Sequence, residues 1–503
     1  MTGFEFDFFA LFFASVQIAY FGSMLVMLYL FTRPVNFVDV REGYGKPDHR
    51  LPYIVLFYPV LRELESTMRT TFLTLERIDY PKSRFKVVAI PNADDLATVA
   101  SLERLKGEFP FLELLEVPPT SHPSWQVVWD GWNRSPHAYW WHRGARAGTR
   151  ALPPKKTRQL VYAFYTMAKQ LDHLDDFLVN YIDADSCPPA DHFRAAAAGI
   201  GRYDVLQAQN IAGNLNASLA ASWHAFDHMA WDGHIYPHLS ANGAHPYWVL
   251  GKGLFFKASD LTELGGFNPW ITIEDPEVGM RFWAHGRRLG VIENPLIEEV
   301  PSTFAHGITQ RKRWVAGFFQ SLAQPLVEMG MSPRQRFLAR LNFVPCLSLW
   351  LNSVGWPLAV YVTWQYFSGH LALPHWMLLL GLVNGVLFLG LLGGVYARTW
   401  VRSKLVLKSR RERALYLFRV NPLFVLAWWF VWLVPLFIGL RMFLLDQGLV
   451  WERTEKTDAN HSLIRAVLIP RGVSQPVAVP EAIPALPRAE HSPSLQPKVY
   501  SNA

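Results

Sequence analysis

Two acidic pairs follow apolar segments, in positions where carboxylates could hold a cation or move a proton. The run FLVNYI (177–182) leads directly into Asp183, Ala184 and Asp185. Two carboxylates one residue apart at a strand end can hold a divalent cation and leave coordination positions for phosphate oxygens. Acidic residues at strand ends are also common in turns and caps, so this pattern has a structural alternative.

The second pair, Glu274 and Asp275, precedes Pro276 in the segment WITIEDPEVGMRFW. Apolar neighbours such as Ile271 and Ile273 predict a partly enclosed carboxylate, whose pKa can be tuned toward that of a general base. Asp-Pro-Glu is also a typical helix start, so a capping role is the alternative interpretation.

The third group is the run Gln310-Arg311-Lys312-Arg313-Trp314. An indole such as Trp314 can stack on a sugar face, while Arg313 and Gln310 can hydrogen-bond phosphate or hydroxyl groups. The alternative is a basic cluster whose aliphatic stems lie along a membrane surface.

Membrane segments must flank these groups, because the apolar residues are unevenly distributed. The chain has 503 residues, of which 50% are hydrophobic and 18% charged, which excludes both a disordered chain and a protein wholly within lipid. Residues 8 to 31 and 371 to 397 are charge-free runs longer than the roughly 20 residues that cross a bilayer. Residues 343 to 367 and 421 to 440 are further candidates. The first run lacks a basic flank and a small-residue cleavage site, so we expect a retained anchor over 1 to 35.

The net charge of +7 has a local origin. Residues 398 to 419 carry eight Lys or Arg against the single acid Glu412, which accounts for the whole net charge. A short basic loop between apolar segments marks the cytoplasmic side and faces anionic lipids, so no nucleic-acid partner is expected. The two cysteines, Cys187 and Cys346, lie far apart in the sequence and suggest neither a disulfide framework nor a zinc site.

The region from 50 to 320 alternates short apolar runs with helical stretches such as 62 to 76 and 155 to 172, which predicts an α/β domain with a mainly parallel sheet. The expected strands are 53–58, 85–90, 112–117, 177–182 and 204–209. Ligands bind beyond the carboxyl ends of such strands, which is where the first acidic pair lies.

Other segments have different characters. Residues 118 to 154 hold five tryptophans, which could be sugar platforms or lie at the membrane interface, although an insertion that packs its own indoles is the favoured interpretation. Residues 321 to 342 are expected to form interfacial amphipathic helices before a C-terminal membrane region over 343 to 450. The tail from 470 to 503 has seven prolines and is expected to be disordered.

Taken in order, the Asp-Ala-Asp, Ile-Glu-Asp and Gln-Arg-Lys-Arg-Trp groups resemble the D, DxD, TED and QxxRW motifs of family 2 glycosyltransferases, specifically the membrane-embedded, cellulose-synthase-like branch. The resemblance covers roughly residues 50 to 320. Supporting matches are Tyr80-Pro81-Lys82, Gly251-Lys252-Gly253, Gly265-Gly266-Phe267, and Trp451, Lys456, Thr457 and His461 over 451–469. Two departures are that Pro91-Asn92 with Asp94 and Asp95 stand where the family's first aspartate is expected, and that Ile273 replaces the TED threonine.

The resemblance implies a GT-A-type, Rossmann-like cytoplasmic domain flanked by transmembrane helices, and inverting transfer of a sugar from a nucleotide sugar such as a UDP-sugar. It implies Asp275 as the catalytic base with Glu274 beside it, and Mg²⁺ or Mn²⁺ held by Asp185 with Asp183. The implied substrate-binding residues are Gln310, Arg313, Trp314, Lys156, Arg158, Asn92, Asp94, Asp95, Asp183, Gly251 and Lys252. Of these, Lys156 is expected at the diphosphate, with Lys155 and Arg158 as competitors, and Asn92, Asp94 and Asp95 near the uracil and ribose.

The expected product is a growing polysaccharide that is passed across a bacterial inner membrane, with export partner proteins as possible associates. The alternative is a single sugar added to a lipid acceptor, and a third hypothesis is a catalytically idle export scaffold. Asn352, Gln365, His375 and Asn384 are candidates for a polar glycan path or for contacts that hold helices together. A full crossing at 421 to 440 would put Trp451 to His461 outside the cell, so we favour a re-entrant segment there.

Overall fold

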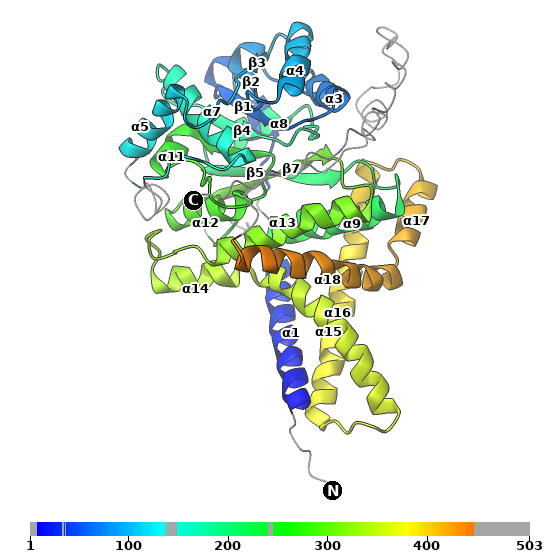
Figure 1. Ribbon diagram of the computed structural model, residues 1–503. Coiled ribbons are helices and arrows are strands. Elements are labelled where there is room, and N and C mark those ends of the chain that lie inside the picture. Colours follow the sequence, from blue (N-terminus) through cyan, green and yellow to red (C-terminus); the bar gives the residue numbers. More distant parts are fainter. Residues whose placement is uncertain are drawn as a thin grey trace, which may run out of the picture.

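The computed structural model describes residues 8–32, 35, 37–135, 137, 148–239 and 245–446, as a sheet-bearing part that stands above a stalk of long helices (Figure 1). The post-membrane segment 451–469, the tail 470–503, and Trp140 and Trp141 lie outside the described residues.

The sheet has seven strands in the order β3-β2-β1-β4-β6-β5-β7. Strand β6 is antiparallel to both of its neighbours, and the other pairs are parallel, which confirms the expectation of a mainly parallel sheet. The strands are β1 (Ile54–Pro59), β2 (Phe85–Ile90), β3 (Leu112–Leu114), β4 (Leu178–Tyr181), β5 (Val205–Ala212), β6 (Leu254–Lys257) and β7 (Leu289–Glu298).

Both faces of the sheet are buried, because alternate strand residues point into two separate cores. On β1, Val55 and Phe57 belong to one core, whereas Ile54 and Leu56 belong to the other. The helices over the first face are α5 (Gln126–Arg134), α7 (Lys156–Gln170), α11 (Ala258–Glu263) and α12 (Asp275–Ala284). Those over the second face are α3 (Glu65–Glu76), α4 (Leu96–Glu108) and α8 (His192–Gly199).

Two strands were not expected from the sequence. Strand β6 has only four residues, and its apolar run is too short to distinguish from the start of a helix. Strand β7 contains Asn294-Pro295, which is typical of a turn, but the structure accommodates it as an irregularity in the register with β5 between Ala208 and Asn210.

The tryptophan-rich insertion packs on itself and on the domain, which confirms the favoured interpretation for its described residues. The rings of Trp125 and Trp129 stack with centroids 5.7 Å apart, and Trp129 contacts Trp132 at 5.4 Å. The Trp132 indole also donates to the carbonyl oxygen of Gly265 at 3.1 Å, which fixes the insertion to the sheet-bearing part.

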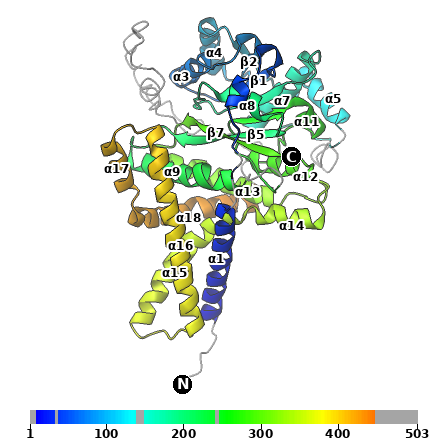
Figure 2. The same cartoon turned by 180° about the vertical axis from the view of Figure 1, so that it is seen from behind.

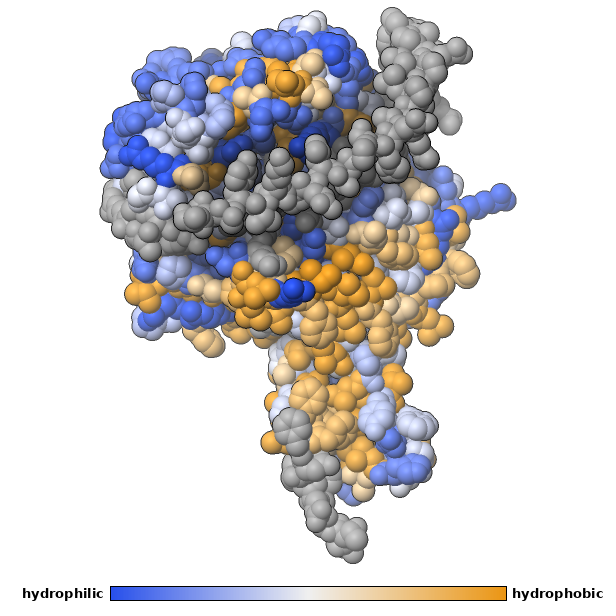
Figure 3. Space-filling view, viewed as in Figure 1, coloured by the Kyte–Doolittle hydropathy of each residue, from blue (hydrophilic) through white to orange (hydrophobic). Residues whose placement is uncertain are grey.

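The stalk consists of α1 (Phe8–Thr32), α15 (Val344–Phe367) and α16 (His375–Arg402), which run side by side in both views (Figures 1 and 2). By length and composition, three helical segments in the described part of the chain could cross a membrane: Leu11–Phe31, His375–Leu405 and Leu426–Leu444. Hydrophobic side chains gather over the stalk and around its upper end, whereas the sheet-bearing part is largely hydrophilic (Figure 3).

Helix α18 (Pro422–Leu444) forms the segment for which re-entry is expected, and re-entry stays a prediction. It is one continuous helix, with Pro422 in its first turn and Pro435 in its interior. In both views it lies across the stalk and alongside α13 (Phe304–Leu322) instead of continuing the stalk direction (Figures 1 and 2). One face is buried, with Trp432 and Leu436, and the opposite face exposes large apolar side chains such as Phe437.

The remaining helices connect these parts. They are α2 (Arg41–Tyr44), α9 (Leu219–Ala230), α10 (Tyr236–Leu239), α14 (Pro333–Leu341) and α17 (Arg410–Arg419), with one turn of π-helix at Trp231–Ile235. The expected basic loop is largely helical and docks on the sheet-bearing part. Arg402 donates to Gln209 on β5, and Arg419 donates to the Asn216 carbonyl oxygen at 2.9 Å.

Two polar residues of the stalk have described side-chain contacts, and only one of these contacts joins two helices. Asn384 of α16 donates to the side-chain oxygen of Gln17 on α1 at 2.6 Å and to its carbonyl oxygen at 3.1 Å. Gln365 instead donates to the hydroxyl of Tyr361 on its own helix at 2.9 Å. Asn384 is therefore a helix-to-helix contact, the second of its two interpretations.

Candidate functional site

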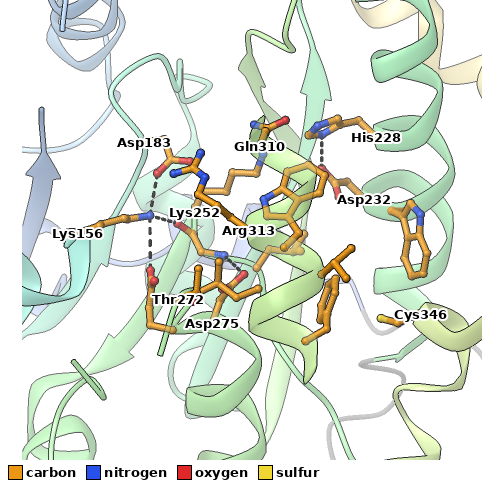
Figure 4. Close-up of a pocket in the computed structure, with 18 of the residues that line it drawn as sticks. Lys156, Asp183, His228, Asp232, Lys252, Thr272, Asp275, Gln310, Arg313 and Cys346 are labelled. Carbon is orange, nitrogen blue, oxygen red and sulfur yellow. Dashed lines mark hydrogen bonds and ion pairs between the residues drawn. The ribbon is translucent and has the colours of Figure 1, made fainter. Parts of the chain in front are cut away.

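A cavity of about 300 Å³ lies between the carboxyl ends of β1 and β4 and the helices α9, α13, α15 and α18. Its charged wall is made by residues at the ends of strands and the starts of helices, with Lys252 from the loop before β6; the others include Lys156, Asp183, Asp185, Glu274 and Asp275. Its opposite wall is made largely by Trp314, Phe318, Phe319, Cys346, Leu349, Trp350, Trp432 and Leu436. Figure 4 shows how the charged and aromatic groups face the same space.

The Asp183-Ala184-Asp185 turn is held by the elements around it. The carbonyl oxygen of Ala184 accepts from the hydroxyl of Tyr58 on β1 at 2.5 Å and from that of Thr71 on α3 at 3.0 Å. The Asp185 carboxylate accepts from the backbone N–H of Glu299 at 2.9 Å, which ties the turn to the end of β7. These contacts leave the side chain of Asp183 43% exposed at the cavity.

Lys156, at the start of α7, crosses between the two acidic pairs. Its ammonium donates to Asp183 and to the Gly251 carbonyl oxygen, both at 2.7 Å, and lies 3.6 Å from Glu274 (Figure 4). Burial alone would lower the pKa of Lys156, but the carboxylates of Asp183 and Glu274 outweigh it and raise that pKa above its usual value. The competing Lys155 donates instead to the Ile271 carbonyl oxygen at 3.0 Å.

Glu274 and Asp275 begin α12 without capping it through their side chains. The Asp275 carboxylate accepts from the backbone N–H of Gly251 at 2.9 Å. Burial, reinforced by the neighbouring Glu274 carboxylate, raises the pKa of Asp275 to about 8, and Lys156 opposes this rise. A carboxylate with this pKa is suited to accept a proton near neutral pH.

The Gly251-Lys252 segment is positioned from two sides. Gln207 of β5 accepts from the backbone N–H of Leu250 at 2.7 Å and donates to the Lys252 carbonyl oxygen at 2.9 Å. The Lys252 ammonium pairs with Glu298 at the end of β7. Burial, together with repulsion from Asp185 and Asp183, raises the pKa of Glu298 to about 7, although Lys252 opposes it.

Negative charge is therefore concentrated where the sequence predicts a cation. Asp183 and Asp185 both line the cavity, and their negative charges contribute to the raised pKa of Glu298. Within the described residues, no group of three or more His, Cys, Asp or Glu side chains could hold a metal ion. The two carboxylates fit a cation that completes its coordination with phosphate oxygens and water, as magnesium does in many nucleotide sites.

Helix α13 carries Gln310, Arg313 and Trp314 to the cavity (Figure 4). Gly317 allows this helix to approach the Ile-Glu-Asp segment, since a Cβ at Gly317 would lie 2.1 Å from the side chain of Ile273. One turn further along, Gln320 accepts from the backbone N–H of Thr272 at 2.7 Å. The second and third sequence groups are thus brought together by direct packing.

A buried ion pair behind Trp314 joins three helices, and we call it the Arg311 cluster: Arg311, Asp227, Trp428 and Trp432. Arg311 is 1% exposed and donates to the Asp227 carboxylate at 2.7 Å. The indoles of Trp428 and Trp432 donate to the same carboxylate at 3.0 and 3.1 Å. The guanidinium also lies 5.0 Å from both of those rings.

The close approach of α18 to α13 depends on Gly439. A Cβ there would lie 2.6 Å from Val315 and 2.7 Å from the carbonyl oxygen of Lys312. Helix α18 therefore rests directly on the helix that carries Arg313 and Trp314.

The residues expected at the base and ribose lie outside the cavity lining. Arg158 donates to the side-chain oxygen of Asn92 at 2.8 Å, and Asp94 acts on the pKa of Arg158, so these three residues are grouped. Asp95 caps α4 by accepting from Thr98, and also accepts from the backbone N–H of Arg62 at 2.8 Å. The placement of Asp95 near the nucleotide stays a prediction.

Sequence reasoning missed several residues of the cavity. Asp227, His228 and Asp232 line it from α9 and the π-helical turn that follows, and Glu63 lines it from the loop after β1. The four-residue spacing of His228 and Asp232 places them on one face of a helix and is the signal that could have found them.

Comparison with known proteins adds the following. The family model described as "Glycosyl transferase family group 2" matches residues 178–444, from β4 to the end of α18. No curated protein matches the chain.

Two solved structures illustrate the likeness of fold. One is the mannosyltransferase PcManGT from Pyrobaculum calidifontis in complex with GDP-Man and Mn²⁺, with 17% identity over 86% of this chain and 98% of that chain and a TM-score of 0.48. The other is S. aureus TarS 1-349 in complex with UDP-GlcNAc, with 13% identity over 78% of this chain and 92% of that chain and a TM-score of 0.33. Because both TM-scores are low, the assignment below rests on the family match and on the cavity.

Proposed function

Since this chain belongs to the family described as glycosyl transferase family group 2, we propose that it transfers a sugar from a nucleotide sugar, such as a UDP-sugar, to an acceptor hydroxyl at the membrane surface. The observation that carries this proposal is the charged wall. A carboxylate with a raised pKa, Asp275, faces the same cavity as the Asp183 and Asp185 pair.

Asp275 is the proposed base. In inverting transfer the acceptor hydroxyl loses its proton as it attacks the anomeric carbon, and the diphosphate leaves from the opposite face. Asp275 can take that proton because burial favours its protonated form. The Gly251 N–H fixes the orientation of its carboxylate, and Glu274 keeps its pKa high.

The leaving diphosphate needs positive charge. Asp183 and Asp185 would hold Mg²⁺ or Mn²⁺, which would supply charge to stabilise the phosphate oxygens. Lys156 lies against Asp183, and Arg313 lines the cavity from α13, so both are proposed to contact the diphosphate. Gln310 and Lys252 are proposed to hydrogen-bond the donor, and Trp314 to stack on a sugar ring.

The second wall of the cavity favours a lipid as the acceptor. Phe318, Phe319, Trp350 and Leu436 give it an apolar lining that comes from the helices nearest the stalk. Such a lining can hold the apolar chain of a lipid. We therefore propose that the acceptor is a membrane lipid with a hydroxyl-bearing headgroup.

A growing polysaccharide is the second candidate, and the motif series is the observation that favours it. Asp183-Ala184-Asp185, Glu274-Asp275 and the α13 residues follow one another as in polysaccharide synthases of the cellulose-synthase-like branch. Under this alternative the enzyme would act processively and pass its product across the membrane. Either acceptor is consistent with a multi-pass protein whose sheet-bearing part faces the cytoplasm.

The test uses the full chain in nanodiscs with Mg²⁺ or Mn²⁺, a panel of UDP-sugars and a lipid extract. UDP release and product size are followed together, with Asp275→Asn as the control. Metal-dependent UDP release with a single-sugar lipid product, lost in the variant, is the expected result.

Other outcomes decide between the candidates. A long product would favour the polysaccharide synthase. An active Asp275→Asn variant would reject Asp275 as the base, and UDP release without any added metal would reject the cation. Absence of turnover with every donor would favour a scaffold that has lost catalysis.

A further inference from the structure

The cavity has a second polar feature, a His-Asp pair on the side away from the Asp183 turn (Figure 4). His228 and Asp232 lie one helical turn apart, and the Nδ1 atom of His228 is 2.9 Å from the Asp232 carboxylate. Both line the cavity and both are more than nine-tenths buried. The mechanism proposed above uses neither of them.

The pairing determines the chemistry of the imidazole. A carboxylate accepts hydrogen bonds only, so Nδ1 carries the proton and Nε2 presents a lone pair. Burial lowers the pKa of His228, with Asp232 opposing, which keeps the ring neutral near pH 7. The Nε2 atom is buried and has no hydrogen-bond partner in the structure. A buried lone pair without a partner costs free energy that a bound hydroxyl would recover.

The neighbours of His228 point to the acceptor. Its ring packs edge-on against Trp314, with centroids 5.9 Å apart, on the wall that carries the apolar lining. The side-chain oxygen of Gln310, on the same helix as Trp314, is also buried and without a partner. Two unsatisfied acceptors therefore flank the indole that is proposed to hold a sugar ring.

We infer that His228, oriented by Asp232, accepts a hydrogen bond from a hydroxyl of the acceptor headgroup and thereby selects acceptors that combine a hydroxylated headgroup with an apolar tail. This inference rests on the proposed function. His228 is a binding residue for the acceptor, and Asp232 is a positioning residue that fixes the tautomer and the ring orientation.

The test uses octyl β-glucoside, below its micellar range, as a probe with sugar hydroxyls and an apolar tail. UDP release by the nanodisc-embedded full chain is measured while the probe and the UDP-sugar are titrated separately. His228→Ala is expected to raise the KM for the probe about ten-fold, as expected for one lost hydrogen bond, and to change the KM for the UDP-sugar less than two-fold.

His228→Gln offers an amide oxygen in place of Nε2 and is expected to recover most of the probe affinity, which also guards against a folding defect in the alanine variant. His192→Gln is the matched control, because His192 is buried outside the cavity lining and packs on Phe255. It is expected to leave both KM values unchanged.

An unchanged KM for the probe in His228→Ala would overturn the inference, as would equal changes in both KM values. If the wild type releases UDP but the probe never accelerates release, the acceptor class is wrong while glycosyl transfer stands. If no UDP-sugar is turned over at all, the proposed function itself fails.

Discussion

The two walls of the cavity differ in origin and in the use of their charges. The charged wall comes from the ends of strands and the starts of helices, where Lys156, Asp183 and Asp275 meet the cavity directly. The aromatic wall comes from helices, and there the Asp227 carboxylate, although it lines the cavity, is neutralised by Arg311, which is enclosed in the wall. Charge that faces the cavity can act on a substrate, whereas charge enclosed in the wall can only fix geometry.

This difference separates two kinds of variant. Changes in the charged wall should alter the rate with little effect on folding, because those groups face the cavity and do not belong to the apolar cores. Changes in the Arg311 cluster should alter folding first and activity through it.

Asp275→Asn should lower kcat by about 10³-fold, since a general base contributes about 10²–10⁴ in rate. The amide keeps the size of the side chain and, like the protonated carboxyl that the raised pKa favours, carries no charge, so the thermal midpoint should change little. UDP release and thermal unfolding of the same preparation measure both. A variant that loses activity only because it unfolds would contradict the separation of the walls.

Arg311→Met should destabilise the protein by about 3–5 kcal/mol, because it leaves the Asp227 carboxylate buried without its cation. Combining it with Asp227→Asn should restore part of the loss, and the double-mutant cycle measures the coupling. Denaturant unfolding in detergent is the measurement. A decrease in the free energy of unfolding below about 1 kcal/mol, which is typical of a surface ion pair, would show that the Arg311 cluster does not stabilise the aromatic wall.

Trp432→Phe should lower the free energy of unfolding by about 1.5–3 kcal/mol, which is the contribution of a hydrogen bond to a charged group. It removes the indole N–H that donates to Asp227 at 3.1 Å and keeps an aromatic ring beside Arg311. Trp364→Phe is the matched control, since Trp364 is 63% exposed on α15. Equal effects of the two changes on the unfolding midpoint would argue against a specific role for α18.

The pH dependence of kcat should reflect the titration of the charged wall and not that of the Arg311 cluster. With the pKa of Asp275 near 8, kcat should rise about ten-fold per pH unit up to about pH 8 and then level off, because only the deprotonated carboxylate acts as a base. Folding stability should change in the opposite direction. The raised pKa favours the folded state at low pH, and this contribution is lost as pH rises through 8. A flat kcat between pH 6 and 8 would reject Asp275 as the titrating group.

The sequence predicts the charged wall better than the aromatic wall, for a physical reason. Asp183, Asp185 and Asp275 follow short apolar runs, and the topology of a parallel sheet brings such positions to one edge. Strands β1, β2, β4 and β5 were found for the same reason, because buried strands have a recognisable pattern.

The aromatic wall depends on how helices pack, which local patterns do not specify. Trp432 and Leu436 lie more than a hundred residues beyond Gln310 in a segment that resembles a membrane span. Only the tertiary structure reveals that α18 lies across the stalk and reaches Asp227. Strand β6 was missed similarly, since its place between β4 and β5 is not a local property.

The position of Trp350 and Trp432 in the cavity has a consequence for biogenesis. These residues leave the ribosome only after α1 and the first part of the stalk have been synthesised, so the cavity is completed last. A nascent chain that has been synthesised as far as β7 already contains every carboxylate of the charged wall, but it does not yet contain the helices of the aromatic wall that follow β7. We therefore expect the enzyme to gain activity only once α18 has joined the folded protein, so that sugar transfer cannot begin on a half-made chain.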